Sequence, residues 1–122
     1  MSETMTSTKG NRPLNDYEKL ILSRLLACDF KGRETVALQL RSVTARPLDD
    51  SGSIELVTDV GTRADVATRV PVEAQCVDVD GVPISVLLFV VNGFVNELEF
   101  SKADGSAIKR MPEPQALDVF PR

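Results

Sequence analysis

Two aspartates one residue apart, Asp78 and Asp80, precede Gly81 in the stretch Asp-Val-Asp-Gly-Val. Carboxylates at this spacing suggest a nucleophile with its proton-handling partner, the oxygen ligands of a cation loop, or the polar tip of a β-hairpin. A second pair, Glu97 and Glu99, shares one face of a predicted strand, because side chains alternate along strands. These four carboxylates are the candidates for acid chemistry.

The surroundings of the Asp78–Val82 motif argue against the first two uses. Haloacid-dehalogenase-like phosphatases carry a similar Asp-x-Asp-Gly motif, but theirs ends a parallel strand, whereas Val82 opens straight into another predicted strand. A calcium loop would need oxygen ligands at Cys76 and Leu87, which supply none. We therefore predict a hairpin turn with solvated aspartates.

Histidine is absent from the chain, and cysteine occurs only at Cys28 and Cys76. Without histidine, serine triads, cysteine–histidine dyads and histidine-based metal sites are excluded. The two cysteines lack Cys-x-x-Cys spacing, so we expect buried free thiols in a reducing compartment. We therefore expect neither a metal site nor a cofactor.

Negative charge is concentrated in the middle of the chain. The net charge is −4, and residues 47–101 contain ten acidic residues against two basic ones. This distribution argues against nucleic-acid binding, which depends on basic clusters, and is compatible with either a basic protein partner or a solvated acidic face. The longest apolar run, 86–91, is far below the roughly 20 residues that a membrane span needs. Because the N-terminus also lacks a signal-like apolar region, we expect a cytoplasmic protein.

Helical signals are confined to the N-terminal part. Asn15 and Glu18 have capping-box spacing, and apolar residues then recur at helical intervals, which predicts a helix over 16–28. The segment 33–41 fits either a helix or a strand; we favour a helix because its residues are adequate helix formers. Residues 1–12 are expected to form a disordered tail.

Strand signals dominate after residue 43, and no helical pattern interrupts them. We predict an α+β fold in which two N-terminal helices pack on one face of an antiparallel sheet of about five strands. The predicted domain spans 13–112, and 113–122 form an extended C-terminal tail. To place Val77 and Val79 in the core, we predict a β-bulge near Cys76. A three-residue loop over 91–93 would pair Val86 with Leu98.

This register leaves a strip of apolar residues on the second face of the sheet, bordered by two carboxylates. The strip and its acidic border comprise Leu87, Phe89, Val91, Val95, Glu97 and Glu99. Two short helices cover one face of a sheet, so the strip must be covered by the C-terminal tail or by a second protein.

Four segments resemble a family of small uncharacterised bacterial proteins, known as a domain of unknown function. They are Gln39-Leu40, 78–84, 93–100 and 102–108, and the resemblance covers roughly residues 13–112. It implies a bacterial cytosolic α+β domain and supplies no catalytic residue.

The sequence favours a non-enzymatic interaction domain, which self-associates as a homodimer or binds a protein partner through the strip. One specific form is an immunity protein that neutralises a basic toxin. The alternative is a small-molecule-binding or acid-catalysed enzyme domain that uses Asp78, Asp80, Glu97 and Glu99. That alternative requires a pocket with at least two of these carboxylates and one raised pKa.

Overall fold

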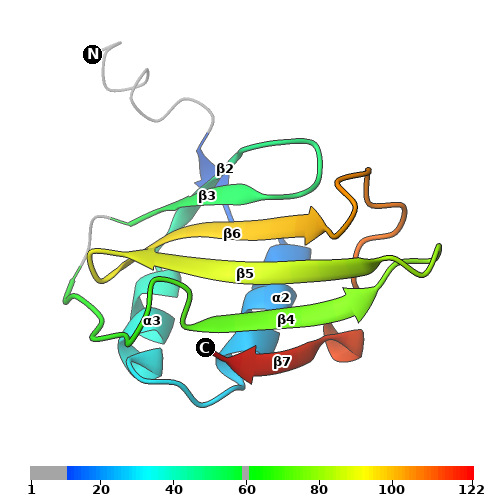
Figure 1. Cartoon of the computed structure of the whole chain (residues 1–122). Helices are drawn as coiled ribbons and strands as arrows, with labels where there is room; N and C mark the ends of the chain where they lie inside the picture. The colour runs from blue at the N-terminus through cyan, green and yellow to red at the C-terminus, as the bar shows by residue number, and fades with distance from the viewer. Residues whose placement is uncertain (1–10, 59–60) are drawn as a thin grey trace, which may run out of the picture.

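A computed structural model describes residues 11–58 and 61–122 (Figure 1). The elements follow the order β1 (Arg12–Pro13), α2 (Asp16–Leu26), α3 (Arg33–Leu40), β2 (Thr44–Pro47), β3 (Ile54–Val57), β4 (Val72–Val77), β5 (Pro83–Val91), β6 (Phe94–Lys102), the 3-10 helix η1 (Pro114–Ala116) and β7 (Asp118–Pro121). In the described part of the chain, no helix is long and apolar enough to cross a membrane.

The prediction of about five strands was wrong, because the antiparallel sheet has seven within the described residues. Their order is β1-β2-β3-β6-β5-β4-β7. Strand β1 begins at Arg12, the last residue of the expected N-terminal tail, whose residues 1–10 lie outside the described residues. Strand β7 lies inside the expected C-terminal tail, and both strands are too short to show a periodic pattern. In Figure 1 the helices lie behind the sheet, where α2 contacts β4 and η1 while α3 contacts β6. The prediction of two helices packed together as one layer on the sheet is corrected as well, because the two helices contact different strands.

Local signals set both helix starts. The predicted capping box is confirmed: Asn15 Oδ1 accepts a hydrogen bond from the Glu18 backbone N–H at 2.8 Å, and Glu18 Oε1 accepts one from the Asn15 N–H at 3.0 Å. The ambiguous segment is helical, as favoured, and follows Gly32 at φ +88°. A Cβ at Gly32 would lie 2.9 Å from the Asp65 carbonyl oxygen, so glycine is required there.

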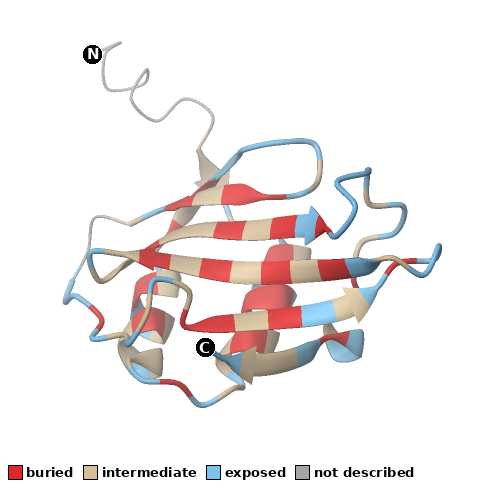
Figure 2. Ribbon diagram, viewed as in Figure 1, coloured by how far each residue is buried: buried red, intermediate tan, exposed pale blue. Residues whose placement is uncertain are grey.

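The hydrophobic core lies between the helices and the sheet. Figure 2 shows buried and half-buried residues alternating along β5, most of β6 and the first half of β4. The buried positions include Ile21, Leu25, Val36, Val72, Ala74, Val86, Leu88, Leu98 and Phe100.

The strand register differs from the predicted one at both hairpins. Val86 lies opposite Phe100 rather than Leu98, because a two-residue Asn92-Gly93 turn joins β5 to β6 and a bulge at Phe89/Val90 absorbs the extra residue. The bulge predicted near Cys76 was also wrong: β4 pairs with β5 without a register shift.

The C-terminal residues extend the sheet instead of covering its second face. β7 pairs with β4, and Leu117, which is 2% exposed, enters the core. The Arg24 guanidinium donates to the backbone oxygens of Pro114 at 3.2 Å and Leu117 at 2.9 Å. The segment therefore docks along α2 and one sheet edge.

Candidate functional site

The face of the sheet turned away from the helices, here called the outer face, faces the viewer in Figure 1, and no described helix or strand lies in front of it. Five of the six residues of the predicted strip share this face, and all five are half-buried: Leu87, Phe89, Val91, Glu97 and Glu99. Val95 is 3% exposed and belongs to the core on the opposite face. The predicted strip therefore contributes three apolar side chains and two carboxylates to the outer face.

The bulge explains the position of Val95. Phe89 pairs with Glu97, but the next residue, Val90, pairs with Val95, so Asn96 is an extra residue on β6. One extra residue reverses the alternation of side chains, which returns Val95 to the core.

Both carboxylates on β6 lie beside apolar side chains. Leu87 is opposite Glu99, and Glu97 has Phe89 on one side and Glu55 of β3 on the other. Arg46 forms an ion pair with Glu55, whereas Glu97 and Glu99 have no ion pair within 4.0 Å among the described residues. Burial raises the pKa of Glu97, and repulsion from Glu99, Asp49 and Glu55 raises it further despite the attraction of Arg69.

Arginine side chains lie against the aromatic rings of the same face. The Arg69 guanidinium lies 5.8 Å from the centre of the Phe89 ring, and that of Arg63 lies 5.6 Å from the Phe94 ring centre. These distances are typical of cation–π contacts. The outer face thus already holds guanidinium groups next to its apolar strip.

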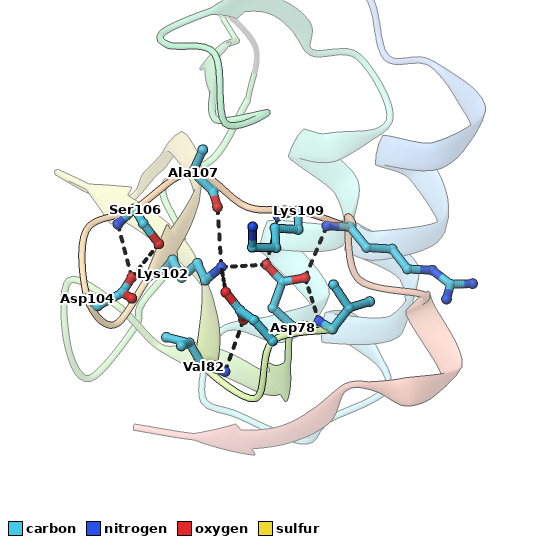
Figure 3. A network of polar contacts seen from close by, with 10 residues as sticks. Asp78, Val82, Lys102, Asp104, Ser106, Ala107 and Lys109 are labelled. Atoms are coloured by element: carbon cyan, nitrogen blue, oxygen red, sulfur yellow. Dashed lines mark hydrogen bonds and ion pairs between the residues drawn. The ribbon is translucent and has the colours of Figure 1, made fainter.

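The aspartates of the β4–β5 turn form a separate polar network with Lys102 (Figure 3). The Lys102 ammonium lies 2.9 Å from Asp78 Oδ2 and 2.6 Å from Asp80 Oδ2, and it donates to the Ala107 oxygen at 3.3 Å. The side chains of Asp78 and Lys102 have no exposed surface. The prediction of solvated aspartates was therefore wrong for Asp78, although Asp80 is exposed.

The Asp78 side chain points inward because it continues the alternation of β4, in which Val72 and Ala74 are buried. Its two neighbours in sequence therefore point outward. Val77 and Val79 are 64% and 63% exposed, although we predicted both for the core. Asp78 accepts hydrogen bonds from the backbone N–H groups of Val79 at 2.7 Å, Lys109 at 2.7 Å and Arg110 at 3.1 Å. The carboxylate thereby fastens the loop after β6 to the β4–β5 turn.

The network holds its groups in their charged forms. Burial alone would raise the pKa of Asp78, but the hydrogen bonds from Lys109, Lys102 and Val79 outweigh it and hold this pKa well below its usual range. Burial would lower the pKa of Lys102, but its bonds to Asp80 and Asp78 raise it. A pair that stays ionised is poorly suited to proton transfer near neutral pH.

The four carboxylates proposed for acid chemistry lie at two separate places. A cleft of about 260 Å³ next to the β4–β5 turn includes Asp78 and no other member of the set. Asp80 is bound to Lys102 at this turn, while Glu97 and Glu99 lie on the outer face. The sequence did not identify Lys102 as a site residue, because only the observed register places it opposite the buried Ile84.

Acid should weaken the fold through Asp78. The folded-state pKa lies below the unfolded value of about 3.9, so the unfolded chain binds more protons and stability decreases as the pH falls. This contribution is complete above about pH 5 and decreases progressively below it. We expect Asp78→Asn to flatten the dependence of the unfolding free energy on pH in this acidic range, as measured by urea unfolding at several pH values. An equal slope in the variant and the parent would contradict this role.

Comparison with known proteins places most of the chain in one family. A family model described as "Domain of unknown function (DUF6984)" matches residues 11–112, from β1 to the loop before η1. This match confirms the predicted resemblance to a domain of unknown function. No curated protein and no solved structure matches the chain.

Proposed function

The chain belongs to the DUF6984 family, a domain of unknown function, and we propose that it is a non-enzymatic interaction domain that binds a protein partner through the outer face. The observation that carries the proposal is the uncovered apolar strip of Leu87, Phe89 and Val91. The C-terminal segment, which could have covered this strip, forms η1 and β7 at the sheet edge.

The edges of the sheet are poorer association sites than its outer face. Both edge strands contain a proline, Pro13 in β1 and Pro121 in β7. Proline has no N–H group to donate, so such strands resist pairing with another chain. Association therefore favours packing against the outer face.

The charge of the outer face favours a basic partner over a second copy of the chain. Glu97 and Glu99 lack an ion pair among the described residues. A second copy would bring two more such carboxylates to the contact, while its Arg63 and Arg69 already lie against Phe94 and Phe89. A basic surface would supply the opposite charge. Neutralisation of a basic toxin in a bacterial cytosol is one specific form of this proposal.

Site-directed photo-crosslinking tests this function. Benzoylphenylalanine is introduced at Phe89 or, as a control, at Leu20, which is 57% exposed on α2. After irradiation in a lysate of the source cells, we expect position 89 to give a discrete adduct with a second polypeptide that position 20 does not give. The purified partner should then bind the unmodified chain, and Phe89→Asp should abolish that binding. Identical adducts at both positions, or none at position 89, would refute the proposal.

A further inference from the structure

We infer that the partner places an arginine side chain between the carboxylates of Glu97 and Glu99, over the apolar side chains of Leu87 and Phe89. This inference rests on the proposed function and specifies its chemistry. The recognised feature is a guanidinium flanked by apolar residues on a protein surface.

Four side chains on two adjacent strands are arranged to receive a guanidinium group. Glu97 and Glu99 are two residues apart on β6, which spaces them by about 7 Å along the strand. Their cross-strand partners on β5 are Phe89 and Leu87. A planar guanidinium with five N–H donors can bind both carboxylates from this position, whereas a single ammonium is a point charge.

Part of the negative charge on the outer face is not compensated by an ion pair among the described residues. Glu97 lies directly opposite Glu55, and like charges in opposite positions destabilise a sheet. Arg46 pairs with Glu55, so that its charge is compensated within the chain. Glu97 and Glu99 form no ion pair with a described residue, although Arg69 attracts Glu97 from beside Phe89. Both carboxylates can therefore pair with a cation from another molecule, and half-buried charges are screened by salt less than exposed ones.

This surface already accommodates guanidinium groups. The contacts of Arg69 with Phe89 and of Arg63 with Phe94 place two of them against aromatic rings of the face. A guanidinium is weakly hydrated and packs readily on such rings, unlike a strongly hydrated ammonium. The partner group is therefore arginine rather than lysine.

Titration with short peptides, followed by amide NMR shifts, tests the inference without the natural partner. The probe is acetyl-Leu-Arg-Leu-amide, and its matched control contains citrulline, a neutral isostere of arginine. We expect the arginine peptide to shift the amide signals of residues 87, 89, 97 and 99, and the citrulline peptide to bind about tenfold or more weakly, as for loss of a charge-assisted hydrogen bond. A lysine peptide should also bind more weakly than the arginine peptide.

Matched variants localise the effect. Glu97→Gln with Glu99→Gln should weaken arginine-peptide binding about tenfold or more. Glu34→Gln should leave it unchanged, because Glu34 is an exposed carboxylate on α3, away from the outer face. Equal binding of the arginine and citrulline peptides, equal binding of the lysine peptide, or shifts centred on other carboxylates would overturn the inference. The proposed function is tested separately by crosslinking from position 89, because an adduct with a second polypeptide can form there whether or not that polypeptide presents an arginine.

Discussion

Replacing Lys102 with methionine is expected to lower the midpoint of thermal unfolding by on the order of 10 °C or more. Lys102 is the cation that faces Asp78 and Asp80, and the side chains of Lys102 and Asp78 have no exposed surface. Methionine fills a similar volume but leaves the Asp78 carboxylate buried without its counter-ion. Removal of one partner from a buried ion pair is among the most damaging single changes in a protein.

Lys109→Met is the matched control for this prediction. Lys109 is exposed and lies in the same loop, and it contributes its backbone N–H to Asp78 rather than its ammonium. The control should therefore melt within a few degrees of the parent, as expected for a surface substitution. Thermal unfolding followed by circular dichroism compares the two variants. If Lys102→Met is no less stable than Lys109→Met, the network does not anchor the turn.

A chain that ends at Pro112 is expected to lose stability and to aggregate. The truncation removes β7, which exposes the backbone edge of β4, and it removes Leu117 from the core. The single substitution Leu117→Ala should cost about 2–5 kcal/mol of unfolding free energy, and the truncation should cost at least as much. Unpaired strand edges also promote association with other chains.

Chemical denaturation and light scattering measure these two consequences. Arg122→Ala serves as a mild control at the same end of the chain, because its ion pair with Glu73 is partly exposed. Aggregation confined to the truncated chain is the expected pattern. A truncated chain that stays monomeric and as stable as the parent would show that the C-terminal segment is dispensable.

Much of the fold could be predicted because its signals are local. The capping box at Asn15 and the alternating pattern of the central strands do not depend on distant residues. The edge strands could not be predicted in this way. β1 has two residues and β7 has four, so each exists only because a neighbouring strand supplies its hydrogen bonds.

The β4–β5 turn shows why alternation alone can mislead. Val77 and Val79 conflict in parity with the upstream apolar residues of β4, and the prediction resolved the conflict with a bulge. The chain resolves it by burying Asp78 and exposing both valines. This solution depends on Lys102, which lies far away in sequence and becomes a neighbour only in the correct register.

The candidate site could be predicted to the extent that its strands are regular. Leu87, Phe89 and Val91 share a face because β5 alternates without interruption. Val95 lies on the opposite face because Asn96 is the extra residue of the bulge. The sequence alone does not show at which residue a bulge occurs.

Light scattering of the full-length chain over a concentration series decides whether the outer face is kept for a different protein or pairs with a second copy. If the outer face binds a different, basic partner, the measured mass should be that of one chain, 13.3 kDa, at every concentration. The Phe89→Asp variant should give the same mass. A dimer that Phe89→Asp dissociates would contradict the account, because the outer face would then be covered by a second copy of the chain.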